Sequence, residues 1–199
     1  MTLDRAAGSL HDTPATRRAR LLAILRERAV SFGDFTLASG RKSGYYIDAR
    51  VVTLHHEGAY LIARAILDFL SAGGIDADAV GGLAIGADPI AGAVAALSYL
   101  EAAPLSGFIV RKESKGHGTG RRIEGGLASG ARVVVVDDVI TTGGSTLAAI
   151  RAVEEIGCKV AAVVCVIDRE EGGGQTLKDY RFHPLFSVSE LVDRSAGRA

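Results

Sequence analysis

Residues 133–146 read Val133-Val134-Val135-Val136-Asp137-Asp138-Val139-Ile140-Thr141-Thr142-Gly143-Gly144-Ser145-Thr146. The apolar run favours a strand buried on both faces, and the spacing of apolar residues from about 145 to 156 favours a helix directly after the loop. In an open α/β sheet, the loop between a parallel strand and its helix lies where ligands bind. This segment therefore predicts an α/β fold with a ligand site at the carboxyl end of the strand.

The loop after this strand has the composition of a sugar-phosphate site. Its small residues allow the backbone of 141–146 to approach a phosphate, whose charge the N–H groups and the helix dipole favour. Asp137 and Asp138 suit sugar hydroxyls better, because carboxylates accept hydrogen bonds. A solvated Asp pair before an ordinary helix cap would explain each feature singly but the whole run poorly. Further donors are the hydroxyls of Thr141, Thr142, Ser145 and Thr146.

Apolar runs and helical periodicity alternate on both sides of this segment. We expect helices at 18–29, 57–70, 89–100 and 145–156, and strands at 35–37, 45–47, 79–85, 107–110, 132–136 and 160–167. The alternation predicts a central, mainly parallel sheet flanked by helices. Residues 1–17 lack periodicity and predict a flexible tail, which leaves 18–199 as a single domain. Residues from about 18 to 50, with the end of the chain, are expected to form a small hood.

Composition excludes several classes of protein. The 199 residues carry 23 Lys and Arg against 23 Asp and Glu, so the formal net charge is zero and any anion site must be local. The longest nearly uncharged stretch, 89–100, is too short to cross a bilayer, and residues 1–20 hold no apolar secretory segment. We therefore expect a cytoplasmic protein that binds neither nucleic acid nor membrane.

The cysteines and one histidine pair have simple structural explanations. Cys158 and Cys165 lie seven residues apart, and Cys165 falls in an apolar run, so both are expected to be reduced thiols in or near the core. His55 and His56 precede a helix, with no Cys or carboxylate at a familiar metal-binding spacing. Helix capping or solvent exposure is expected for them instead.

A second polar segment concentrates positive charge. It begins at the end of a predicted strand, lacks apolar periodicity, and contains Arg111, Lys112, Lys115, His117, Arg121 and Arg122. On a chain with no net charge this is a local anion trap. Beside a phosphate-binding sheet, its glycines suggest a lid that closes over a polyanion and excludes water. A solvated loop is the alternative if the segment is taken alone.

The order of strand, Asp137-Asp138, two residues and Thr141-Thr142-Gly143-Gly144-Ser145 resembles the phosphoribosyl diphosphate signature of type I phosphoribosyltransferases. Arg111-Lys112-Glu113-Ser114-Lys115-Gly116-His117-Gly118 resembles the catalytic loop of the orotate phosphoribosyltransferases. Residues 35–46 are similar to that family's N-terminal hairpin, and Ile167-Asp168-Arg169 takes the place of its base-recognition strand end. No dinucleotide or P-loop nucleotide motif is present.

The resemblance implies a type I phosphoribosyltransferase fold and transfer of ribose 5-phosphate from phosphoribosyl diphosphate to orotate. It implies that Lys115 and His117 are catalytic, that Mg²⁺ is held mainly by the substrate with no protein ligand, and that a homodimer shares the loop between subunits. The implied orotate contacts are Thr141, Arg169 and Lys42. The implied phosphoribosyl diphosphate contacts are Arg111, Lys112, Lys115, His117, Asp137, Asp138, Val139, Ile140, Thr141, Thr142, Gly143, Gly144 and Ser145.

One segment departs from the family pattern. Some members carry Tyr-Lys where this chain has Ile85-Gly86, so a side-chain contact to diphosphate is missing and backbone amides would have to replace it. Two other functions fit part of the sequence: a transcriptional regulator that binds phosphoribosyl diphosphate, and a purine phosphoribosyltransferase. The intact Lys115/His117 loop and the lack of a basic helix argue against the first. The second leaves Arg169 and the hairpin unexplained.

Overall fold

A computed structural model describes residues 13–36, 40, 42–112 and 122–192. Within these ranges the predicted alternation of strands and helices is confirmed. The elements are α1 (Pro14–Arg28), β1 (Val30–Thr36), β2 (Lys42–Ile47), α2 (Arg50–Thr53), α3 (His56–Ala72), β3 (Ala79–Leu83), α4 (Asp88–Leu100), β4 (Ser106–Val110), β5 (Ile123–Glu124), β6 (Arg132–Ile140), α5 (Gly144–Glu155), β7 (Lys159–Asp168), α6 (Gly173–Thr176), β8 (Phe182–Ser187) and α7 (Val188–Leu191).

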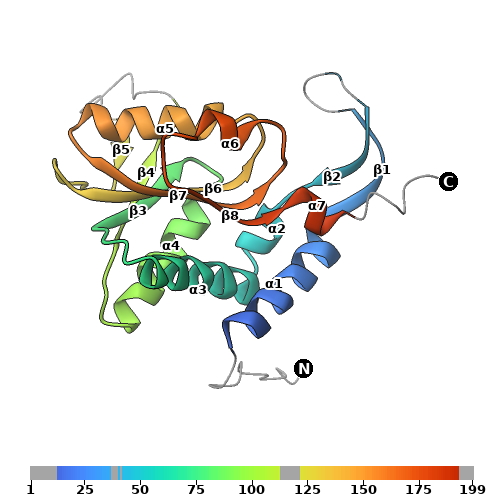
Figure 1. Ribbon diagram of the computed structural model, residues 1–199, viewed down its shortest axis with the longest axis horizontal. Helices are drawn as coiled ribbons and strands as arrows, with labels where there is room; N and C mark the ends of the chain where they lie inside the picture. Colours follow the sequence, from blue (N-terminus) through green and yellow to red (C-terminus); the bar gives the residue numbers. More distant parts are fainter. Residues whose placement is uncertain (1–12, 37–39, 41, 113–121, 193–199) are drawn as a thin grey trace.

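The central sheet has six strands in the order β5-β4-β3-β6-β7-β8. All neighbouring strands are parallel except β5, which runs antiparallel to β4. From β3 the chain passes through α4 to β4 on one side, whereas from β6 it passes through α5 to β7 on the other (Figure 1). The strand order therefore reverses between β3 and β6, and a crevice for ligands forms at such a point.

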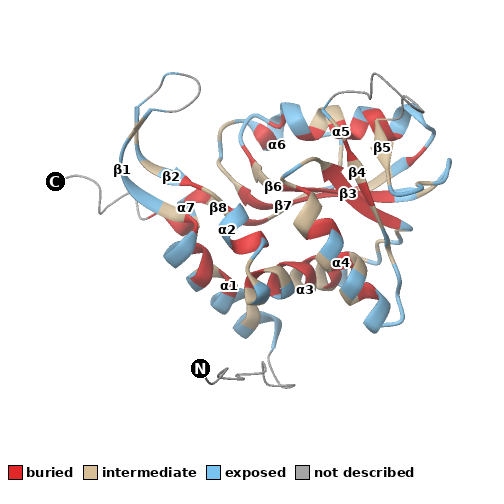
Figure 2. Ribbon diagram, turned by 180° about the vertical axis from the view of Figure 1, so that it is seen from behind, coloured by how far each residue is buried: buried red, intermediate tan, exposed pale blue. Residues whose placement is uncertain are grey.

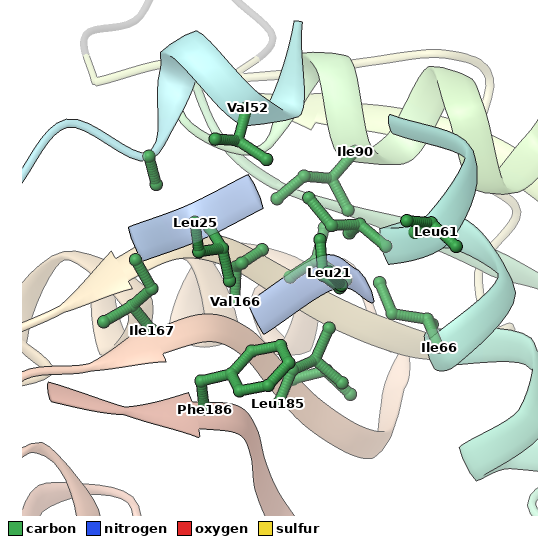
Figure 3. Close-up of a cluster of buried hydrophobic side chains, with 14 of the residues drawn as sticks. Leu21, Leu25, Val52, Leu61, Ile66, Ile90, Val166, Ile167, Leu185 and Phe186 are labelled. Carbon is green, nitrogen blue, oxygen red and sulfur yellow. The ribbon is translucent and has the colours of Figure 1, made fainter. Parts of the chain in front are cut away.

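Two apolar layers hold the helices on the sheet. One lies beneath α1, α3 and α4 and includes the buried side chains of Leu21, Ile66, Ile90 and Phe186 (Figure 3). The other lies beneath α5 on the opposite face and includes Ile150. Figure 2 shows the strands buried between these layers and the outward helix faces exposed. Both faces of the sheet are therefore withdrawn from water, as expected for parallel strands.

The four valines of β6 pack into both layers. Val134 and Val136 belong to the cluster beneath α3 and α4, and Val133 and Val135 to the cluster beneath α5. Successive side chains of a strand point to opposite faces, so an unbroken apolar run is what a doubly covered strand requires. This packing explains why the segment predicted a central strand, and it anchors the residues that follow.

A two-stranded antiparallel hairpin, β1 and β2, extends beyond the end of the sheet (Figure 1). Helices α1 and α7 pack beside it: Arg26 donates hydrogen bonds to the Glu190 carbonyl, and Arg18 lies 2.5 Å from the Glu190 carboxylate. The first and last described helices therefore come together in the part of the chain predicted as the hood.

Some boundaries predicted from the sequence are wrong. Residues 14–17, expected in a flexible tail, form the first turn of α1 because the Thr13 side chain caps it and Pro14 occupies the first helical position. Strand β6 continues to Ile140 rather than ending at 136, since it pairs with β7 that far. Strand β8 was not predicted, because Pro184 disfavours a strand; the position is tolerated here on the sheet edge.

The expectations for the two cysteines and for His55 are confirmed. Both cysteines are free and buried. His55 caps α3, its Nδ1 accepting a hydrogen bond from the Gly58 N–H at 3.4 Å. In the described part of the chain, no helix is both long and apolar enough to cross a membrane, and no three His, Cys, Asp or Glu side chains are grouped to hold a metal ion.

Candidate active site

A cavity of about 860 Å³ opens where the strand order reverses. It lies at the carboxyl ends of β3, β4 and β6, the edge at which the sequence predicted a ligand site. Of the predicted site residues, its lining includes Arg111, Lys112, Asp137, Asp138, Val139 and Ser145. The other lining residues are Ile47, Asp48, Ala49, Arg50, Leu83, Ala84, Ile85, Gly86, Asp88, Ile109 and Glu124.

Asp137 is a buried carboxyl at the inner end of the cavity, with 8% of its surface exposed. Its Oδ2 accepts a hydrogen bond from the Thr146 hydroxyl at 2.8 Å, and its Oδ1 accepts one from the Asp138 N–H at 3.0 Å. Burial raises the pKa of Asp137 to about 7, despite the opposing hydrogen bond from Thr146. The prediction that Thr146 donates to a phosphate is therefore wrong, because its buried hydroxyl is used to orient Asp137.

Asp138 stands beside it, half-buried and facing the cavity, and its Oδ1 accepts a hydrogen bond from the Val139 N–H at 2.8 Å. The loop after β3 rests against this carboxyl. A Cβ atom at Gly86 would lie 2.5 Å from Asp138 Oδ1 and 3.1 Å from Asp137 Oδ1. A side chain at position 86 would therefore require the Asp138 carboxylate or the loop to shift. Ile85 has an exposed apolar side chain, so residues 85 and 86 offer only backbone groups to an anion.

The loop from β6 to α5 meets the cavity at Ser145, whereas the other predicted residues of this loop, Thr141, Thr142, Gly143 and Gly144, are not in the described lining. Gly143 adopts φ 82° as the N-cap of α5, a left-handed conformation that favours glycine, and no side chain caps the helix. The first N–H groups of α5 therefore stay available to a ligand. Thr141, Thr142 and Ser145 are exposed, whereas the Ile140 side chain is buried in the core. Ile140 can therefore contribute only backbone atoms to a ligand.

Charge in the described lining is more acidic than basic. Three cations, Arg50, Arg111 and Lys112, face five carboxylates: Asp48, Asp88, Glu124, Asp137 and Asp138. Arg111 also lies 3.6 Å from Glu124, and Arg50 lies 2.9 Å from Asp48. Lys115 and His117, the predicted catalytic residues, lie outside the described residues.

The three predicted orotate residues are placed differently. Arg169 and Thr141 follow adjacent strands, and the Arg169 N–H donates to the Ile140 carbonyl at 2.8 Å. The side chain of Arg169 is 10% exposed, with Nε 3.0 Å from Glu171 and the guanidinium 5.7 Å from the centre of the Tyr45 ring. Lys42 donates to the Thr36 hydroxyl at 2.8 Å within the hairpin. None of the three, Lys42, Thr141 or Arg169, is in the described lining of the cavity.

Sequence reasoning missed several lining residues. Asp48 and Arg50 form a close pair at the start of α2, with two side-chain hydrogen bonds of 2.9 and 3.0 Å. Their signal was a charged Asp-x-Arg directly after the strand predicted at 45–47. Asp88 begins α4; burial raises its pKa, and its Oδ1 has no hydrogen-bond partner among the residues the structure describes. Its signal was a carboxylate before Pro89 at a strand-to-helix turn.

Residues 52–190 match the phosphoribosyl transferase domain family. An orotate phosphoribosyltransferase from Rhodopirellula baltica is 49% identical over 161 residues, 79% of this chain and 83% of that protein. One from Aquifex aeolicus is 43% identical over 180 residues, 88% of this chain and 97% of that protein. The crystal structure of Mycobacterium tuberculosis orotate phosphoribosyltransferase with phosphoribosyl diphosphate superposes with a TM-score of 0.75, at 36% identity, covering 88% and 98% of the two chains.

The fold, the acidic strand end and the open N-terminus of α5 are thus those of a phosphoribosyl transferase domain. Within this class, the sequence is more than 40% identical to orotate phosphoribosyltransferases over most of both chains. The chain belongs to the orotate phosphoribosyltransferase family, which confirms the resemblance read from its motifs.

Proposed function

We propose that this chain transfers the 5-phosphoribosyl group of phosphoribosyl diphosphate to orotate, giving orotidine 5′-monophosphate and diphosphate in the synthesis of UMP. The observation that carries the proposal is the Asp137-Asp138 pair beside the uncapped start of α5, in one cavity at the reversal of strand order. Sugar hydroxyls and a phosphate need these two environments side by side. Family membership supports orotate as the acceptor. We place the enzyme in the cytoplasm.

The acidic pair acts on the ribose. Asp138 and Asp137 accept hydrogen bonds from ribose hydroxyls, and their negative charge offsets the positive charge that develops on the ring as the bond from the anomeric carbon to diphosphate breaks. A nitrogen of orotate attacks this carbon from the opposite face, and the bonding electrons leave with diphosphate. Thr146 holds Asp137 in place for this role.

The phosphate loop binds the other end of the sugar. Residues 141–145 surround the 5-phosphate, with backbone N–H groups at the start of α5 and the exposed hydroxyls of Thr141, Thr142 and Ser145 as donors. Binding of the 5-phosphate at this loop orients the anomeric carbon toward orotate and so lowers the entropic cost of the reaction. Arg169 and Thr141, after adjacent strands, bind orotate; the planar fork of Arg169 suits its oxygens.

The leaving diphosphate meets Arg111 and Lys112 at the end of β4, with Lys115 and His117 as further cations. The cavity also fits Mg²⁺ held by substrate and water. Asp88 Oδ1 has no hydrogen-bond partner within the described ranges and burial raises the pKa of Asp137, and a nearby cation would stabilise both carboxylates. Asp88, Asp137 and Asp138 would hold the water molecules bound to Mg²⁺, and the bound ion would neutralise charge on the leaving group.

We further propose a homodimer in which the loop bearing Lys115 reaches the partner's cavity.

An assay with phosphoribosyl diphosphate, Mg²⁺ and a panel of orotate, uracil, adenine, guanine and hypoxanthine tests the proposal. We expect product with orotate alone, and none after chelation of the metal. Equal or faster turnover of a purine would contradict the assignment of acceptor. Binding of phosphoribosyl diphosphate without turnover of any base would instead favour the regulator.

A further inference from the structure

The short helix α6 lies on the same side of the sheet as α5 and backs the phosphate loop (Figure 1). The Thr176 hydroxyl donates a hydrogen bond to the Thr142 carbonyl at 2.7 Å. That oxygen belongs to the loop between β6 and α5, whereas Thr176 lies 34 residues further along the chain. A side chain outside the sequence motif therefore holds the backbone of the motif.

Packing at Gly143 shows how closely α6 meets the loop. A Cβ atom on Gly143 would lie 3.2 Å from the Thr176 Cβ and 3.3 Å from the Gly173 carbonyl oxygen. The turn at Gly143 therefore has α6 directly behind it. Because Gly143 is buried while Thr141, Thr142 and Ser145 are exposed, the open side of the loop is the one that α6 does not cover.

The hydrogen bond sets the direction of one peptide group. In a planar trans peptide, the carbonyl and the N–H point in opposite directions. With the Thr142 carbonyl directed at Thr176, the Gly143 N–H is directed away from α6, toward the open side where a phosphate can bind. Without the Thr176 hydroxyl this peptide group loses its fixed partner, and the donor that it presents is no longer pre-oriented.

We propose that Thr176 is a positioning residue for the 5-phosphate: its hydroxyl fixes the 142–143 peptide group so that the loop donates to the phosphate. This rests on the proposed function, in which residues 141–145 hold the 5-phosphate. Thr176 is not in the described lining of the cavity and contacts the Thr142 carbonyl, so its effect is expected at the phosphate end of the site. The base end, at Arg169, keeps its own contact with Glu171 and its place above Tyr45.

The test compares Thr176→Val, which keeps the shape but removes the donor, with Thr176→Ser, which keeps the donor. Ser189→Ala is the matched control, because Ser189 is also exposed and its hydroxyl donates to Glu170 at 3.0 Å, away from the cavity. Calorimetry measures binding of ribose 5-phosphate, steady-state kinetics measures KM for each substrate, and thermal unfolding measures Tm.

We expect Thr176→Val to weaken ribose 5-phosphate binding and raise the KM for phosphoribosyl diphosphate by about fivefold, or about 1 kcal/mol. The KM for orotate and the Tm stay near wild type, and Thr176→Ser restores binding. The inference fails alone if the wild type binds ribose 5-phosphate and turns over orotate but Thr176→Val matches it, or weakens both substrates equally. If the wild type neither binds ribose 5-phosphate nor turns over orotate, the proposed function is wrong, and the inference that rests on it is wrong too.

Discussion

Replacing Asp137 with asparagine is expected to stabilise the unliganded protein at alkaline pH while it removes the activity. Asp137 is buried, and burial raises its pKa from 3.8 to about 7. For a carboxyl with a raised pKa, the stabilising contribution of the neutral form is complete below 3.8 and is lost as pH rises through about 7. Above that pH the folded protein bears a buried charge that the amide does not have.

The size of the effect follows from the shift. About three pKa units correspond to about 4 kcal/mol between the two extremes of pH, and to about 3 kcal/mol between about pH 5 and about pH 8.5. Asparagine keeps only one acceptor for the two donors at Asp137, Thr146 and the Asp138 N–H, which costs roughly 1 kcal/mol at every pH. We therefore expect D137N to be slightly more stable than the wild type near pH 5 and about 3 kcal/mol more stable near pH 8.5.

Urea denaturation of both proteins at the two pH values, without substrate and with chelator, measures the difference. Asp138→Asn is the comparison: it removes a half-buried carboxylate that adds to the raised pKa of Asp137, so we expect it to reduce the change of stability with pH less than D137N does. In the same preparations, turnover of D137N with orotate should fall by about 100-fold or more, because a group that offsets transition-state charge is gone. If the difference in the free energy of unfolding between D137N and the wild type does not change with pH, burial does not raise the pKa of Asp137 to about 7.

Three further predictions concern other parts of the site. Gly86→Ala places a Cβ 2.5 Å from Asp138 Oδ1, so we expect turnover in a steady-state assay to fall by about tenfold or more, and the Tm in thermal unfolding to be lower. Wild-type turnover and Tm would show that the loop after β3 can move aside. Glu171→Gln removes the charge 3.0 Å from Arg169 Nε, so we expect the KM for orotate to rise by about fivefold while the KM for phosphoribosyl diphosphate stays unchanged. A lower KM for orotate would mean that Glu171 competes with the substrate for the Arg169 guanidinium. Mixing inactive Lys115→Ala with inactive Asp138→Asn should restore activity through heterodimers with one intact site, once pull-down of one tagged variant has shown subunit exchange; continued inactivity after exchange would place the loop over its own subunit.

Local sequence by itself determined the centre of the molecule and the class of ligand. The valines of β6, the Asp137-Asp138 pair and the glycines at 143 and 144 act within one strand, one turn and one helix start. Their roles depend on the alternation of side chains along a strand, on the positive φ that glycine adopts in a turn, and on the free N–H groups at the start of a helix, and each of these acts over a few neighbouring residues. For the same reason the parallel sheet and the cavity edge could be predicted from residues 133–146 and the elements around them.

Only the tertiary structure decided how the side chains of the site are used. Thr146 looks like a phosphate donor in the sequence, but folding buries it and directs its hydroxyl to Asp137. The raised pKa of Asp137 exists because helices cover both faces of the sheet and remove water from that carboxyl. Asp88 reaches the cavity from the far side of the strand reversal, and Thr176 reaches the loop from 34 residues away. Burial and contacts between distant segments depend on the whole packed chain, and no local pattern encodes them.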